Sequence, residues 1–202
     1  MSMCQACVRR PRKSFMLFQE LLILCLSNKE KKTMKAFILS QFGYCPLVWM
    51  FDSRKLNHRI NNIHERALRI VYKDRESSFE KLLEKDDSVK IHERNIQTLG
   101  IELYKVAFRL SLKIMNEVFI LNSQPSYPGQ AEFISRNVKT VSYGTETLTH
   151  LGPKIWSMIP MAMKKFSLSK FTKQIRKWKP VNCPCRICKT YIPNLGFVDV
   201  KY

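Results

Sequence analysis

The amino-acid sequence predicts a mainly α-helical protein, a helical bundle followed by a small α+β appendage at its C-terminal end. Through the first half of the chain, apolar residues recur at steps of three and four, which places them on one face of a helix. After residues 122–130, which contain prolines, serines and a glycine, the pattern changes to a short alternation of polar and apolar residues. We therefore expect a basic and apolar N-terminal segment (1–28), a helical bundle (29–121) and a basic appendage with a cysteine-rich tail (122–202).

The clearest element is a long amphipathic helix that follows Ser53 and continues to Tyr72. Ser53 is a suitable N-cap, because its hydroxyl can accept a hydrogen bond from an unpaired backbone N–H of the first turn. The apolar face of this helix consists of Leu56, Ile60, Ile63, Ala67 and Ile70. A basic stripe along one flank consists of Lys55, Arg59, Arg66 and Lys73.

Three further helices are predicted between residues 78 and 119, each introduced by a serine that can cap its first turn. Ser77 and Glu80 have the spacing of a capping box. Gly100 lowers the stability of the second of these helices unless a neighbouring element packs closely against it. The predicted caps are Ser77, Ser88 and Ser111, and the apolar stripe of the second helix runs through Ile91, Ile96, Leu99, Leu103, Val106 and Leu110.

The C-terminal region is predicted to contain two strands and two helices. Residues 137–142 alternate as a strand does, and residues 146–150 suit a return strand. Gly152 and Pro153 are expected to start a short helix that Pro160 ends. The last helix is expected to follow Ser167 and to end at Pro180, with Leu168, Phe171, Ile175 and Trp178 facing inward and with an outward lysine face of Lys170, Lys173 and Lys177.

The charge of the chain is strongly positive and unevenly distributed. The formal net charge is +19, and residues 130–202 carry thirteen basic and three acidic side chains, a net +10. The middle of the chain (36–129) carries fourteen basic and eleven acidic side chains, a net +3. Such an excess favours a polyanionic partner, and RNA or DNA is the commonest one. The basic stripe and the lysine face are the candidate phosphate-binding residues; ordinary solvated helix faces are the alternative interpretation.

Three cysteines in the tail have the spacing of metal ligands. Cys183, Cys185 and Cys188 lie within six residues and could together bind a zinc ion. A structural zinc site needs four ligands, however, and no histidine or cysteine follows them. Cys4 or Cys7 would have to supply the fourth ligand from the other end of the chain. Reduced thiols without a metal are the alternative, and no other cofactor is expected.

The remaining cysteines and the apolar N-terminal run bear on the compartment. Cys25 and Cys45 lie in apolar runs and are interpreted as small core residues, a pattern that suits a reducing, intracellular location in the cytoplasm or nucleus. The apolar run 16–26 follows several basic residues but contains Glu20. It is shorter than the about 20 residues that cross a bilayer, so we expect a buried helix and no membrane partner.

No constellation of catalytic residues is present in the sequence. The four histidines lack the spacing of a hydrolytic triad or of a zinc protease, and there is no glycine-rich phosphate loop. His64 falls at the edge of an apolar helix face and is interpreted as a packing residue. The single Asp86-Asp87 pair is flanked by polar residues and is interpreted as a helix end. The sequence therefore predicts a protein that is not an enzyme.

Four blocks of the sequence, in order, resemble one protein family. They are SQFGYCPLVWMF with SRKLNHRINNIHERALRIVY, then SSFEKLLEKDDSVKIHERNIQTLGIELYKV, then YGTETLTHLGPKIWSMIP, and then FTKQIRKWKPVNCPCRICKTYIPNLGF. Together they resemble the region downstream of the polymerase core in reverse transcriptases of jockey-like non-LTR retrotransposons. The resemblance implies a thumb followed by a C-terminal extension. The palm, which carries the paired metal-binding aspartates of an RNA-directed DNA polymerase, would lie upstream and is not in this chain.

The resemblance implies a function that agrees with the charge. A thumb of this family holds the template–primer duplex, and the tail helps to bind the RNA of the transposable element. We therefore expect sequence-tolerant binding of RNA or DNA through phosphates, no nucleotide addition by the chain alone, and the missing polymerase core as a partner. Two alternatives remain: a zinc-stabilised protein-interaction module, and a small membrane-associated protein anchored by residues 16–26.

Overall fold

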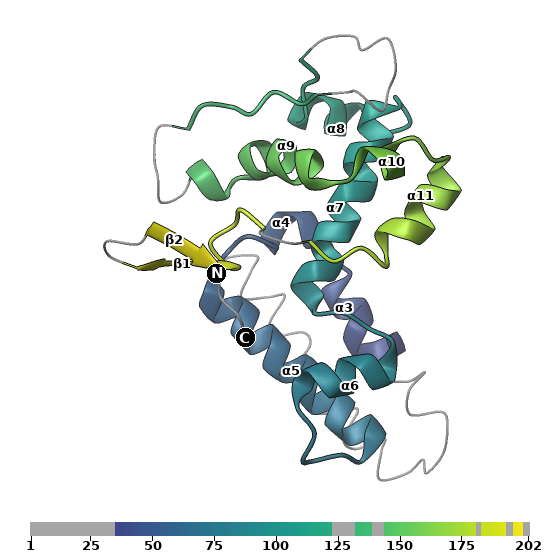
Figure 1. Cartoon of the computed structure of the whole chain (residues 1–202), viewed down its shortest axis with the longest axis vertical. Helices are drawn as coiled ribbons and strands as arrows, with labels where there is room; N and C mark the ends of the chain where they lie inside the picture. Colours follow the sequence, from purple (N-terminus) through teal and green to yellow (C-terminus); the bar gives the residue numbers. More distant parts are fainter. Residues whose placement is uncertain (1–34, 123–131, 139–143, 181–182, 193–195, 200–202) are drawn as a thin grey trace. The chain divides into compact units, whose positions relative to one another are not determined.

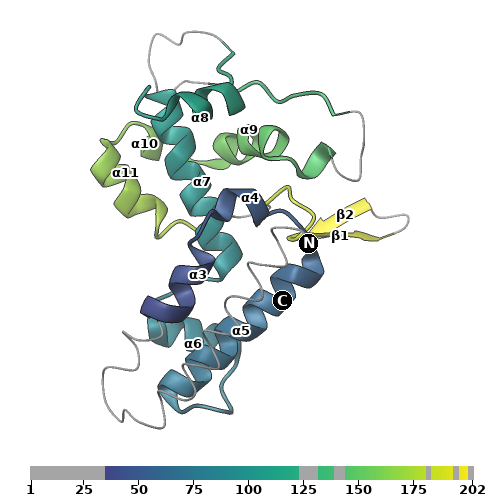
Figure 2. The ribbon, with the colours of Figure 1, turned by 180° about the vertical axis from the view of Figure 1, so that it is seen from behind.

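The computed structural model describes residues 35–122, 132–138, 144–180, 183–192 and 196–199, and these are mainly helical, as predicted (Figures 1 and 2). The chain divides into two compact units, Met1–His92 and Glu93–Tyr202. The apolar run 16–26, the paired Cys4 and Cys7, and all but the first residue of the predicted boundary at 122–130 lie outside the described residues.

The first unit is built around one long helix. It contains η1 (Lys35–Leu39), α3 (Ser40–Phe42), α4 (Pro46–Trp49), α5 (Arg54–Tyr72) and α6 (Phe79–Asp86). The predicted cap of α5 is confirmed, because the Ser53 hydroxyl accepts a hydrogen bond from the Leu56 backbone N–H at 3.2 Å. The helix is capped at its C-terminal end by Lys73, which adopts the left-handed conformation and whose backbone N–H donates to the carbonyl oxygens of Arg69 and Ile70. The predicted polar helix end at Asp86-Asp87 is also confirmed.

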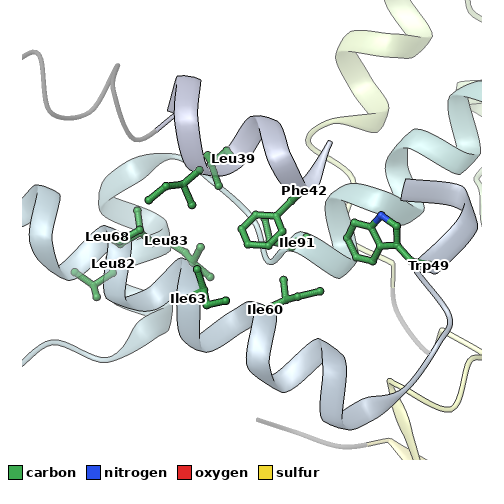
Figure 3. Close-up of a cluster of buried hydrophobic side chains, with 11 residues drawn as sticks. Leu39, Phe42, Trp49, Ile60, Ile63, Leu68, Leu82, Leu83 and Ile91 are labelled. Carbon is green, nitrogen blue, oxygen red and sulfur yellow. The ribbon is translucent and has the colours of Figure 1, made fainter. Parts of the chain in front are cut away.

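The apolar face of α5 forms the centre of a buried cluster (Figure 3). Ile60, Ile63 and Ala67 are buried, as their spacing predicts, while Leu56 and Ile70 pack partly exposed at its margin. His64 is 1% exposed and lies edge-on to the Phe79 ring at 5.7 Å, which confirms its packing role. The other buried members are Ile38, Leu39, Phe42, Trp49, Leu68, Leu82, Leu83 and Ile91.

Several local predictions in this part of the chain are wrong. Ser78, not Ser77, caps α6, because the Ser77 backbone N–H donates to Asp74 Oδ1 at 3.0 Å and belongs to the preceding turn. Ser88 does not cap the next helix; its hydroxyl is buried and has no hydrogen-bond partner among the described residues. Cys45 is exposed rather than in the core, and it adopts the left-handed conformation just before α4.

The second unit is organised around α7. It contains α7 (Ile91–Ala107) from the third residue of that helix onward. The elements that follow are α8 (Lys113–Val118), η3 (Gly144–Glu146), α9 (Leu148–Met158), α10 (Met161–Lys164), α11 (Leu168–Ile175) and the strands β1 (Lys189–Ile192) and β2 (Gly196–Asp199). Figures 1 and 2 both show α10 and α11 beside α7. The two strands form an antiparallel hairpin that begins with the pair Lys189–Asp199.

Close packing of α11 on α7 gives this unit its core. The Tyr104 ring stacks on Phe171 at 4.3 Å between centroids. A methyl group at Gly100 would lie 2.5 Å from Ile175 Cδ1 and 3.2 Å from Ile159 Cδ1. Ile175 and Ile159 therefore pack so closely against α7 that a side chain at position 100 would clash with them, which accounts for a glycine inside this helix.

Other predictions for this unit need correction. Residues 148–150 form the first turn of α9 and not a strand, because Leu148, Leu151 and Ile155 continue one apolar helix face, so that Pro153 lies inside the helix. Residues 137 and 138 are irregular, and 139–143 lie outside the described part.

The ends of three helices in this unit also differ from the predicted ones. Leu110 is 58% exposed, beyond the end of α7. Ser111 does not cap α8, which begins after Leu112. The last helix begins after Ser167 as predicted but ends at Ile175, so Trp178 lies beyond it.

Candidate metal centre

The three tail cysteines and one histidine form a single group of metal-ligating side chains. His92 is the second residue of α7, a continuous helix that extends into the second unit, and the cysteine loop (residues 183–188) supplies Cys183, Cys185 and Cys188. The ligating atoms of these four residues all lie within 4.8 Å of one another. The group could therefore hold a metal ion.

The spacing and burial of the four donors suit a small tetrahedral ion. Zinc with bonds of about 2.0–2.3 Å keeps its donor atoms about 3.3–3.8 Å apart. The sulfur atoms of Cys183 and Cys185 are 3.4 Å apart, and the widest donor separation would need to shorten by about 1 Å. His92, Cys183 and Cys185 are buried, and Cys188 is half-buried. Three thiolates and one imidazole are a donor set that selects zinc over hard cations such as magnesium.

The loop folds as a tight turn around Cys185. The backbone N–H groups of Cys188 and Lys189 both donate to the Cys185 carbonyl oxygen, each at 3.2 Å. This turn brings the Cys188 side chain back toward the first two thiols. The sequence alone shows only that the three cysteines are close along the chain, whereas the turn directs them toward one point.

The thiols of the loop are close enough for their neighbours to change the pKa of Cys183 and of Cys188. Hydrogen bonding from Cys185, and then from Cys188, lowers the pKa of Cys183 to about 4. Hydrogen bonding to Cys183 raises the pKa of Cys188, which keeps its proton. The Cys183 thiolate is thus stabilised by hydrogen bonds from the neighbouring thiols, so Cys183 and Cys188 titrate as a coupled pair.

Charged groups surround the loop. Burial raises the pKa of the Glu146 carboxyl, which lies next to the loop and accepts hydrogen bonds from the Arg186 backbone N–H. Three thiolates, a neutral imidazole and Zn²⁺ would carry a net charge of about −1. The basic residues Arg186 and Lys189, in and just after the loop, would oppose that charge.

Reasoning from the sequence found three of these four donors. His92 was missed because it precedes the cysteines by most of the length of the second unit and has no ligand spacing to them. Cys4 and Cys7, the fourth ligands considered from the sequence, lie outside the described residues. The signal that could have indicated His92 was its burial: it occurs beside Ile91 at the start of an apolar helix face, where a neutral histidine needs a partner.

The predicted phosphate-binding residues all lie at exposed positions. Lys55, Arg59 and Arg66 are exposed on α5, and Lys73 at its end is exposed as well. Of the lysine face, Lys170 and Lys173 are exposed on α11 opposite the buried Phe171 and Ile175, and Lys177 is exposed just beyond the end of the helix. The basic stripe belongs to the first unit and the lysine face to the second. Lys170 also lies over the Phe166 ring, with Nζ 4.2 Å from the ring centroid.

One histidine contacts a serine, but their geometry does not activate the serine. His150 Nδ1 lies 3.2 Å from Ser135 Oγ and 3.3 Å from the Arg136 carbonyl oxygen. Lys154 Nζ lies 2.8 Å from His150 Nε2. When the lysine ammonium donates to Nε2, Nδ1 carries the ring proton and donates to the carbonyl. A histidine in that state cannot take a proton from Ser135.

Searches of protein-family models, of curated proteins and of solved structures found no match to this chain. None of the helices within the described ranges combines the length and the apolar character needed to cross a membrane.

Proposed function

We propose that this chain is a basic, zinc-stabilised nucleic-acid-binding region derived from a reverse transcriptase of the non-LTR class. The observation that carries the zinc part is the meeting of His92 with the three tail cysteines inside 4.8 Å. The lysine face and the resemblance of four sequence blocks support the nucleic-acid part. Catalysis of nucleotide addition would belong to an upstream palm, and this region would act without catalysis.

The zinc ion would have a structural role. Four protein donors fill the coordination shell and leave no position for a reacting water or substrate, which is the arrangement of structural sites. The ion would join the start of α7 to the cysteine loop. Because the donors have to be brought together and deprotonated, the free energy of binding zinc would contribute directly to the stability of the folded tail.

Nucleic acid would bind through its phosphates. Phe171 and Ile175 fix the rotation of α11, because both side chains are buried. Lys170 and Lys173 therefore point outward, and Lys177 is exposed just beyond the helix; no acidic residue occurs from Lys154 to Lys189 in the sequence. Gln97, buried on α7, donates to the carbonyls of Arg176 and Trp178 and holds the chain at the end of α11. Such a surface binds any sequence and depends strongly on salt.

The zinc proposal is tested by metal analysis of the purified full chain. We expect one zinc per chain, with loss of the metal in Cys185→Ser and in His92→Leu. Cys45→Ser is the matched control, because Cys45 is exposed and lies outside the group of donors. A chain that binds no zinc after reduction and addition of the metal would overturn the proposal.

The nucleic-acid proposal is tested by changing all three lysines of the lysine face, Lys170, Lys173 and Lys177, to glutamine. Each lysine that neutralises a phosphate releases about one condensed counterion, so the slope of log affinity against log salt should fall by about three. Glutamine is a good helix former and should leave α11 intact. The control is Lys81→Gln with Lys85→Gln on α6, where Glu80 and Glu84 are close in sequence. Equal binding by both variants and the parent would contradict the proposal.

The proposal also predicts an absence of polymerase activity. The isolated chain, incubated with a primed RNA template, nucleotides and magnesium or manganese, should extend no primer. Extension that co-purifies with the chain through repeated chromatography would show an active site that neither the sequence nor the fold suggests.

One observation favours a second candidate, a zinc-stabilised protein-interaction module. Around α8 the chain exposes large apolar side chains: Leu110 at 58%, Leu112 at 76% and Ile114 at 64%. Exposed apolar clusters are common at protein–protein contacts. This candidate is favoured over nucleic-acid binding if the lysine variant and the parent bind duplexes equally while zinc is retained.

A further inference from the structure

A largely buried carboxylate lies outside the group of donors and contacts the backbone of the cysteine loop. Glu146 is the last residue of η3, and its side chain is only 13% exposed. Its two oxygens accept hydrogen bonds from the Arg186 backbone N–H at 3.2 and 3.3 Å. The Arg186 guanidinium is also near, with Nε 3.8 Å from one carboxylate oxygen.

The backbone contact is the stronger of the two. The Arg186 side chain is 39% exposed, so solvent weakens its ion pair at 3.8 Å. A hydrogen bond from a backbone N–H to a carboxylate is charge-assisted, and such bonds are about twice as strong as neutral ones. The hydrogen bonds from the Arg186 backbone N–H therefore hold Glu146 to the loop more strongly than the ion pair with the Arg186 side chain does.

The hydrogen bonds of Glu146 complete the fixation of a single peptide unit. The peptide between Cys185 and Arg186 has its carbonyl oxygen bonded by the N–H groups of Cys188 and Lys189, as described above. Glu146 binds the N–H of that same peptide. Because a peptide is planar, holding both ends fixes its orientation. That orientation sets the direction of the Cys185 side chain relative to Cys188.

We infer that Glu146 is a positioning residue of the metal centre, which orients Cys185 and Cys188 through the Arg186 peptide. This inference rests on the proposed zinc site. Glu146 is not one of the four ligands; it pre-organises the turn that carries two of them. Outer partners that orient metal ligands typically contribute 10- to 100-fold to metal affinity. The carboxylate also ties η3, and the start of α9 that follows it, to the loop.

The test is zinc affinity of the full chain, measured by competition with a chromophoric chelator. We expect Glu146→Ala to weaken zinc binding by about 10- to 100-fold. Glu146→Gln keeps one oxygen that can accept from the Arg186 N–H, so it should recover most of the affinity. Arg186→Ala removes the ion pair and leaves the N–H in place, so it should bind zinc within about threefold of the parent, as should the control Glu117→Ala on the exposed helix α8.

A cobalt spectrum separates positioning from general loss of structure. The visible bands of Co²⁺ report the arrangement of the four ligands. They should match the parent in Glu146→Gln and shift or broaden in Glu146→Ala at saturating cobalt. Parental affinity and spectrum in Glu146→Ala would overturn the inference, and so would an equal loss in Arg186→Ala. If the parent chain binds no zinc, the proposed metal site itself is wrong. Measurement of the parent alone distinguishes that outcome from a failure of the inference about Glu146.

Discussion

The buried cluster of the first unit and the cysteine loop of the second are held in place by different kinds of contact. The cluster around Ile60 and Ile63 consists of many apolar side chains, most of them on helices adjacent in sequence. The loop is held by a few specific hydrogen bonds, two within its own turn and two to Glu146, which lies far earlier in the chain. The stability of the cluster is therefore spread over many contacts. That of the loop depends on a few, so the loss of any one of them should destabilise the loop.

The largest effect is expected from a charge placed inside the cluster. Ile60 is 2% exposed, so Ile60→Asp would bury a carboxylate with no partner provided for it. We expect a loss of about 4 kcal/mol or more, comparable to the whole stability of a small domain. Circular dichroism during heating should show the loss of helix. Arg59→Asp, at an exposed neighbour, should change stability by about 0.5 kcal/mol or less. An Ile60→Asp variant as heat-stable as the parent would contradict the assigned core.

Removal of the metal should affect the loop and spare the cluster. At free zinc about 1,000 times its dissociation constant, binding stabilises the folded state by about 4 kcal/mol. For a unit of this size that corresponds to a fall in melting temperature on the order of 15 °C after chelation. Calorimetry of the full chain with zinc and with a chelator should show one transition that shifts and one that does not. If chelation lowered the melting temperatures of both transitions equally, the cluster and the loop would not differ in their dependence on the metal.

A smaller effect is expected where α11 crosses α7. Gly100→Ala gains up to about 1 kcal/mol in helix propensity, but the added methyl lies 2.5 Å from Ile175 Cδ1. Overpacking costs about 1–3 kcal/mol, so we expect a net loss of about 1 kcal/mol. Gly43→Ala is the control, because Gly43 is exposed and has a backbone angle φ of −80° that alanine adopts freely. Chemical denaturation measures both, and a stabilised Gly100→Ala would mean that Ile175 moves aside at little cost.

The smallest effect is expected from an ion pair on the surface of α5. Arg69 Nη2 lies 2.6 Å from Glu65 Oε1, four residues earlier on the helix. Pairs of this kind contribute about 0.3–0.5 kcal/mol and weaken with salt. Glu65→Gln should therefore lose about that much at low salt and almost nothing in 1 M salt. A loss above about 1 kcal/mol would mean that single polar contacts also govern the first unit.

Much of the first unit could be predicted from local sequence. The spacing of Ile60, Ile63 and Ala67, and the position of Ser53, are enough to locate α5, its cap and its buried face. Helical periodicity is a local property, so a window of sequence contains the information. The predicted cap at Ser77 failed because that residue belongs to the preceding turn, which the pattern does not describe. The hydroxyls of Ser88 and Ser111 are buried and have no hydrogen-bond partner among the described residues.

For the candidate site, the sequence by itself determined that three thiols lie close together in a basic tail and that the lysines of α11 face away from its apolar side. Only the tertiary structure decided that His92 meets those thiols and that Glu146 holds the Arg186 peptide. Spacing along the chain fixes which side chains share a helix face or a turn. Which distant residues meet depends on how α7, η3 and the tail pack. That packing depends on complementary buried shapes, such as the stacked rings of Tyr104 and Phe171 and the space at Gly100 that Ile175 occupies.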